Sequence, residues 1–98
     1  MPTYVTLYNF RTRGIENVEE LPDHLDGAVE LVDSLGGEIH ETYLTMGEYD
    51  LVTVSEFPDD EAAALAMLRI GQSGVVSSET LKAWPEESFA ELVADLPE

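Results

Sequence analysis

The sequence has no cysteine, and only four of its 98 residues are lysine or arginine. The absence of cysteine excludes a disulfide framework, a thiolate zinc site, an iron–sulfur cluster and a cysteine nucleophile. Proteins bind the phosphates of nucleic acids mainly through Lys and Arg side chains, and basic residues also attract proteins to anionic membranes. We therefore expect no nucleic-acid partner and no membrane partner.

Long apolar runs are also missing. No stretch of the sequence approaches the roughly 18 apolar residues that a membrane span needs. The first residues, MPTYVTLYNF, lack the basic segment and apolar segment of a secretory signal. The sequence thus predicts a cytoplasmic protein.

Acidic residues are abundant. There are 21 Asp and Glu residues, and the formal net charge is −17. Leu, Val, Ile and Phe still make up 27 of the 98 residues, above the roughly 20% below which a charged chain remains disordered. We expect one folded domain over 1–98, with a small core that favours oligomerisation. Salt screens repulsion between like charges, so we interpret the acidity as halophilic adaptation to a salt-rich cytoplasm.

Apolar spacing alternates between the period of a strand and that of a helix. Gly36 and Gly37 end one helical pattern, and acids at 59–61 begin another. Strands are predicted over 3–10, 38–45, 49–56 and 75–84, and helices over 22–35, 59–72 and 85–96, with a helical turn over 15–21. This βαββαβ order with a C-terminal helix predicts an α+β, ferredoxin-like antiparallel sheet with helices on one face. The apolar segment AAALAMLRI needs cover on two sides, and we expect the last helix to supply the second cover.

The central hairpin allows the two faces of the sheet to be assigned. If Gly47 and Glu48 form a two-residue turn, the numbers of facing residues sum to 95. The side expected under the helices comprises Ile39, Glu41, Tyr43, Val52, Val54, Val5 and Leu7. The other side comprises His40, Thr42, Leu44, Leu51, Thr53, Ser55, Tyr4, Thr6 and Tyr8. A second sheet is expected to pack on this mixed side, so we predict a homodimer.

The hairpin reads Tyr43-Leu44-Thr45-Met46-Gly47-Glu48-Tyr49-Asp50. It resembles the signature of the GYD domain family, and the similarity continues from Tyr4-Val5 through Leu35-Gly36-Gly37 and 58–62 to 79–81. The resemblance implies a dimeric α/β barrel, in which two ferredoxin-like sheets pack face to face. It implies no established activity.

Two groups of residues are candidates for ligand binding. Tyr49 and Asp50 would line a pocket at one end of the sheet; alternatively Gly47 makes the turn, Asp50 bonds nearby backbone groups and Tyr49 packs with its hydroxyl satisfied. Arg11 and Arg13 lie two residues apart, so in an extended chain they share one side. They form either a clamp for a small carboxylate or ion pairs with the plentiful acids.

Catalytic residues are harder to identify. His40 is a candidate general base, although it has no visible carboxylate partner in the sequence, and His24 is expected at the surface. Glu41 and Tyr43, expected between the sheet and the helices, are candidates for acid–base chemistry. Neighbouring acids on a helix diverge by about 100°, so no metal site is predicted, and no motif indicates a cofactor.

Three function classes follow from these observations. The favoured one is a small homodimeric ligand-binding or accessory module, which holds a small apolar or carboxylate-bearing molecule. The alternative is a cofactor-independent enzyme that oxidises or isomerises a small organic substrate, as the resemblance to the barrel scaffold also allows. An RNA-binding sheet that stacks bases on Tyr4 and Tyr8 is disfavoured because a basic groove is missing.

Overall fold

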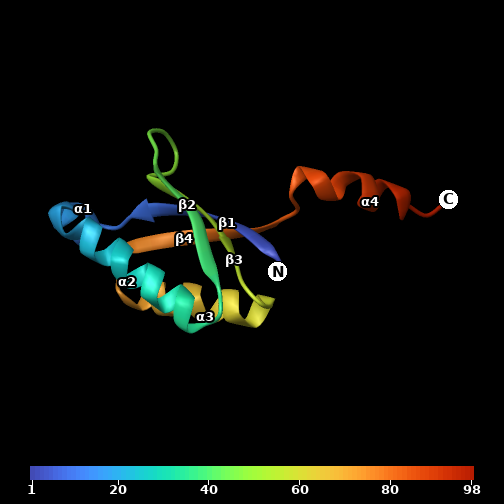
Figure 1. The fold of residues 1–98 in the computed structure, drawn as a ribbon. Helices are drawn as coiled ribbons and strands as arrows, with labels where there is room; N and C mark the ends of the chain where they lie inside the picture. Colours follow the sequence, from blue (N-terminus) through green and yellow to red (C-terminus); the bar gives the residue numbers. More distant parts are fainter.

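The computed structural model describes residues 1–98 and contains one antiparallel sheet with its two long helices on one face (Figure 1). The strand order is β2-β3-β1-β4. The strands are β1 (Thr3–Phe10), β2 (Glu38–Leu44), β3 (Leu51–Glu56) and β4 (Val76–Ala83). The helical elements are α1 (Thr12–Glu16), η1 (Val18–Glu20), α2 (Leu21–Ser34), α3 (Asp60–Gln72), η2 (Glu86–Ser88) and α4 (Phe89–Ala94). The predicted α+β, ferredoxin-like order is confirmed.

Local signals in the sequence account for most of these boundaries. Gly36 follows α2 with a φ of 80°, a conformation that L side chains disfavour and glycine adopts freely. Asp59 caps α3, because its Oδ1 accepts a hydrogen bond of 2.8 Å from the Ala62 N–H. The acids that follow lie in the first turn of α3, where the helix dipole favours negative charge.

The hairpin between β2 and β3 differs from the predicted two-residue turn. Its loop runs over 45–50 and is closed by the Thr45 N–H, which donates to the Asp50 carbonyl at 2.8 Å. Gly47 has a φ of 128°, as its predicted role in the turn requires. Facing residues do sum to 95 for pairs such as Tyr43 with Val52, but an irregularity at His40 shifts the register before it.

The predicted assignment of the two sheet faces is wrong. Tyr4, Thr6 and Tyr8 are buried under the helices, together with Leu51, Thr53 and Ser55 of β3. Tyr4 packs against the small residues of α3, where Ala62, Ala63 and Ala66 leave room for its ring. Both tyrosine hydroxyls find partners there, Asp60 for Tyr4 and Thr53 for Tyr8, so burial does not leave these polar groups unsatisfied.

The opposite face of the sheet carries the aliphatic side chains and has no cover. We call this surface the open face; it contains Val5, Leu7, Val52, Val54, Leu81, Glu41 and Tyr43. Because of the irregularity at His40, Ile39 lies on the helix-covered face of the sheet, whereas Glu41 and Tyr43 lie on the open face. Ile39 packs against the core on the helix side, whereas Tyr43 on the open face is 53% exposed.

The last helix does not cover α3 as expected. Figure 1 shows α4 projecting away from the sheet beyond the end of β4, and the only element it contacts substantially is η2. Leu65 and Leu68 of α3 consequently remain exposed, at 56% and 70%. The molecule extends 53 Å along its longest axis. We call residues 84–98 the C-terminal arm.

Candidate functional site

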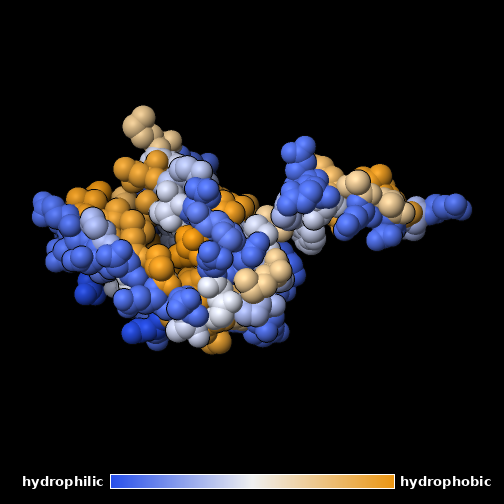
Figure 2. Space-filling model, viewed as in Figure 1, coloured by the Kyte–Doolittle hydropathy of each residue, from blue (hydrophilic) through white to orange (hydrophobic).

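A cavity of about 720 Å³ lies between the helix-covered face of the sheet and helix α2. Its walls are mainly apolar, and Figure 2 shows hydrophobic residues gathered around a hollow in this part of the surface. Helix α2 contributes Leu21, Leu25, Ala28 and Leu31, the sheet contributes Tyr8, Ile39, Leu51 and Val76, and Ile70 and Val75 come from α3 and the segment after it.

The cavity exists because α2 packs on the core near its two ends but not between them. Leu21, at its start, packs against the cluster of Tyr8, Leu51, Val75 and Val76. Val32, near its C-terminus, is 2% exposed and belongs to the core cluster around Phe57. Towards the N-terminus the inward positions include Gly27 and Ala28, which are too small to fill the space above the sheet. Core packing is therefore interrupted between the two ends of the helix and leaves a lined hollow.

Basic side chains gather at this cavity in an otherwise acidic protein. Arg13 and Arg69, two of the four Lys and Arg residues of the chain, line it together with His24. All three side chains are exposed, so they lie at its mouth. Three acids, Glu20, Asp23 and Glu30, lie among the same lining residues, and His24 Nε2 is 3.9 Å from Glu20 Oε2. The mouth is thus polar and the interior apolar.

Tyr8 is the most buried ionisable residue that lines this cavity. Its hydroxyl lies 3.4 Å from the Thr53 hydroxyl, and burial raises the pKa of Tyr8. The phenol therefore stays protonated at neutral pH. In that form it acts as a hydrogen-bond donor or acceptor and does not act as a base.

The structure does not bring Arg11 and Arg13 to one cavity. Arg13 lines the cavity and Arg11 does not. Arg11 itself is extended (φ −86°, ψ 170°), but helix α1 begins at the next residue, Thr12. The extended backbone that would place both side chains on one side therefore ends before Arg13.

Tyr49 and Asp50 lie outside the cavity and act within the loop. The Asp50 Oδ2 accepts a hydrogen bond from the Phe10 N–H at 2.8 Å, and the Asp50 N–H donates to the Tyr8 carbonyl at 2.8 Å. The Tyr49 hydroxyl donates to Glu79 Oε2 at 2.8 Å, and this hydrogen bond raises the pKa of Tyr49. These contacts join the hairpin loop to β1 and β4, in agreement with the structural alternative for the motif.

The candidate acid–base residues are also outside the cavity. His40 lies on the surface with its Nε2 3.5 Å from Glu56 Oε2, a partner that the shifted register brings near and that sequence reasoning missed. Glu41 and Tyr43 were expected between sheet and helices, but both belong to the open face, where the Tyr43 hydroxyl donates to Glu41 Oε2 at 3.3 Å. No three His, Asp or Glu side chains converge as a metal site requires.

Sequence reasoning missed Tyr8, His24 and Arg69 as cavity residues. The one signal for Arg69 was a single cation in the apolar segment AAALAMLRI. Alternation places Tyr8 on the mixed side of the sheet without showing that this side meets the helices, and the sequence predicts only that His24 lies at the surface, where it is found. None of them has a motif, because the cavity is formed by elements that are distant in sequence.

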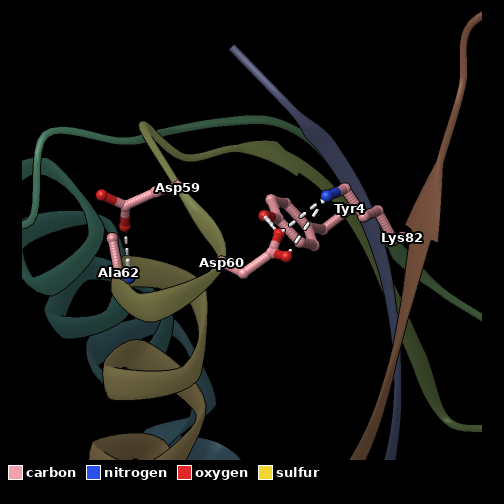
Figure 3. Close-up of polar contacts among 5 residues, drawn as sticks. All are labelled: Tyr4, Asp59, Asp60, Ala62 and Lys82. Carbon is pink, nitrogen blue, oxygen red and sulfur yellow. Dashed lines mark hydrogen bonds and ion pairs between the residues drawn. The ribbon is translucent and has the colours of Figure 1, made fainter.

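A second polar cluster joins α3 to the sheet (Figure 3). Tyr4 donates a hydrogen bond to Asp60 Oδ1, and Lys82 of β4 lies 3.1 Å from the same oxygen. Burial and the hydrogen bond to Asp60 raise the pKa of Tyr4 to about 12, while hydrogen bonds from Tyr4 and Lys82 lower the pKa of Asp60. The cluster ties the first turn of α3 to β1 and β4, next to a smaller cavity of about 350 Å³.

Comparison with models of protein families identifies the family to which the chain belongs. The model of the GYD domain matches residues 4–93. The chain belongs to the GYD domain family. A search of curated protein sequences finds no match.

Solved structures share the fold of this GYD domain. TTHA0845 from Thermus thermophilus is 24% identical, with 87% of this chain and 95% of that chain covered and a TM-score of 0.56. A hypothetical protein, PHS023 from Pyrococcus horikoshii, is 20% identical over 91% and 96% of the two chains, with a TM-score of 0.56. FFRP-DM1 is 19% identical over 86% and 100%, with a TM-score of 0.61. None of the helices combines the length and apolar character that crossing a bilayer requires.

Proposed function

We propose that this GYD domain binds a small organic molecule that has an apolar body and an anionic group. The observation that carries the proposal is the cavity beside α2, which has apolar walls and two arginines at its mouth. Its volume of about 720 Å³ lies within the roughly 300–1,000 Å³ of typical ligand sites. A carboxylate is the favoured anionic group, because guanidinium groups bind it with two parallel hydrogen bonds.

The charge distribution supports an anion at this position. In a protein of net charge −17, a carboxylate is repelled from most of the surface. Arg13 and Arg69 come from α1 and α3, on separate parts of the chain, and both line the same cavity. The apolar body of the ligand would lie against Leu25 and Leu51, with the Tyr8 hydroxyl available for one hydrogen bond.

Binding is favoured over cofactor-independent chemistry by the state of the interior groups. A proton abstraction would need a basic group facing the ligand. The most buried ionisable residue that lines the cavity is Tyr8, whose raised pKa keeps it protonated, and His40, Glu41 and Tyr43 do not line the cavity. These features support a ligand-binding or accessory role.

The test compares octanoate with octanol, which have the same chain length and differ in charge. Binding is measured by calorimetry in about 1 M KCl, with wild type, an Arg13→Gln/Arg69→Gln variant and an Arg11→Gln control. Octanoate should bind more tightly than octanol, and the double variant should lose at least about fivefold in octanoate affinity, because charge-assisted hydrogen bonds contribute about 1.5–3 kcal/mol when partly buried. Equal affinity for both probes, or equal octanoate binding by all three proteins, would contradict the proposal.

We propose further that the protein is a homodimer joined through the open face. Val5, Leu7, Val52, Val54 and Leu81 form an apolar surface that no element of the chain covers, and monomeric proteins rarely expose a contiguous apolar patch of this kind. This keeps the predicted dimer but exchanges the sheet face through which it forms. In molar KCl, Val54→Lys should give monomers by sedimentation, whereas the control Leu68→Lys on α3 should remain dimeric. A dimeric Val54→Lys variant would refute the assignment.

A further inference from the structure

The C-terminal arm exposes five large apolar side chains. Trp84, Phe89, Leu92, Val93 and Leu96 are 54%, 58%, 47%, 65% and 68% exposed. Figure 2 shows the arm standing apart from the body, with hydrophobic residues along it. Nothing in the same chain covers these side chains.

Three apolar residues of the arm, Phe89, Leu92 and Val93, share one side of α4. Leu96, two residues beyond the end of the helix, continues the i, i+3, i+4, i+7 spacing of the same stripe. Glu91 and Asp95 point away from that stripe, since each lies at least about 100° from its centre at 100° per residue. A surface can therefore bury the stripe and leave these acids in water.

An isolated helix of this length does not hold itself together. Helix α4 has six residues, whereas isolated helices shorter than about 12–15 residues are marginal in water. The direction of the chain keeps the arm from folding back, because Pro85 is extended (φ −58°, ψ 154°) and leads α4 away from the sheet (Figure 1). The helix needs a surface from another molecule.

The arm continues directly from the surface that joins the proposed dimer. Leu81 and Ala83 of β4 face the same way as Val5 and Thr3 of β1, on the open face, and Trp84 follows. Four strands spaced about 4.8 Å apart and six to eight residues long at about 3.3 Å each present roughly 450 Å² per subunit. Stable interfaces bury about 800 Å² per partner, so the open face alone falls short and the arm supplies the kind of surface that is missing.

We propose that the arm docks its stripe, Phe89, Leu92, Val93 and Leu96, on a second copy of this chain, and that two arms are exchanged reciprocally in the dimer. This inference rests on the proposed dimer and adds a second contact to it. Reciprocity follows from two-fold symmetry, since each subunit offers the other the same surfaces. The arm and its base thereby become part of the interface.

Charge makes this docking depend on salt. Residues 85–98 carry five acids and no base, and they approach a partner of net charge −17. The Debye length falls from about 30 Å at 0.01 M salt to about 3 Å at 1 M. The arm should therefore be docked in molar KCl and released at low salt, even where the protein remains folded.

Trp84, the only tryptophan, lies at the base of the arm and reports on docking. Sedimentation, Trp84 emission and acrylamide quenching are measured across a dilution series in about 1 M KCl. Emission should shift to shorter wavelength and quenching should fall as dimers form. The monomeric Val54→Lys variant should keep the long-wavelength emission at every concentration.

Paired variants test the stripe itself. Leu92→Ser/Val93→Ser should weaken the dimer at least about tenfold, because each arm loses two buried aliphatic side chains. The control Ala90→Ser/Ala94→Ser changes positions off the stripe and should stay within about twofold of wild type.

Two outcomes overturn arm docking and leave the dimer through the open face intact. One is a dimer in which Trp84 remains as accessible as in the monomer, and the other is equal weakening by both double variants. Protection of Trp84 in the Val54→Lys monomer overturns arm docking too, because the arm would then pack on its own chain, and a wild-type monomer overturns both proposals.

Discussion

Gly14 is the position at which one methyl group should cost most. It lies in α1, and a Cβ added there would be 2.1 Å from the carbonyl oxygen of Val75. That oxygen also accepts a hydrogen bond of 2.9 Å from the Arg11 N–H. Because the obstacle is backbone, Gly14→Ala forces α1 away from the segment before β4.

The expected loss of stability in Gly14→Ala combines two costs and one gain. Overpacking costs about 1–3 kcal/mol, at its upper end for a contact with backbone, and the displaced hydrogen bond is worth about 1 kcal/mol. The higher helix propensity of alanine returns about 0.5–1 kcal/mol. We expect a net loss of about 3 kcal/mol, which lowers the melting temperature by roughly 10–20 °C in a chain of this size.

Gly27→Ala provides the matched control, since it is the same substitution in a helix interior. A Cβ at Gly27 of α2 meets nothing within 4 Å, so alanine should stabilise the protein by about 0.4–1 kcal/mol through the unfolded chain. Both variants and wild type are melted by circular dichroism at one protein concentration in molar KCl. The reasoning is refuted if Gly14→Ala melts within about 3 °C of wild type, or if the two variants shift in the same direction.

Three further predictions concern charge. The melting midpoint should rise from low to molar salt as repulsion among the acids is screened; an unchanged midpoint would contradict the halophilic interpretation. Asp60 has a lowered pKa, so its stabilising effect is present above about pH 4 and is lost as pH falls through the folded-state pKa. The difference in melting temperature between wild type and Asp60→Asn should therefore shrink from pH 6 to pH 2, and a difference that does not change with pH would exclude this role. Asp50→Asn should destabilise the protein by about 1–2 kcal/mol in urea unfolding, because the Phe10 N–H loses its charged acceptor, while Asp50→Asn with wild-type stability would show that the loop holds without it.

Strand and helix positions were predictable because they depend on neighbours in sequence. The alternation in TYVTLYNF, the glycines after α2 and the acids before α3 each act within a few residues, and the structure places β1, α2 and α3 close to the expected bounds. The positive φ of Gly47 was likewise a local requirement.

The sheet faces were not predictable by the same means. Alternation separates Tyr4, Thr6 and Tyr8 from Val5 and Leu7, but it does not say which set meets the helices. Aliphatic residues were assigned inward on hydrophobicity alone. Tyr4 is inward because its ring packs against the alanines of α3 and its hydroxyl donates to Asp60, 56 positions away in sequence.

The cavity was missed for a related reason. Arg13 and Arg69 are far apart in the chain, and they line the same cavity only because α1 and the end of α3 both reach it. The expected clamp of Arg11 and Arg13 assumed an extended chain at both residues, but helix α1 begins between them.

The sequence by itself determined the secondary structure, the βαββαβ order, membership of the GYD domain family and the acidic surface, because each depends on composition or on short-range spacing. Only the tertiary structure decided which face of the sheet the helices cover, where packing stops beside α2, and that the C-terminal arm lies free of its own chain. Those outcomes depend on contacts between elements distant in sequence, which periodicity does not encode. In this protein the same contacts bring two of its few cations to a cavity and leave its most aliphatic surface open.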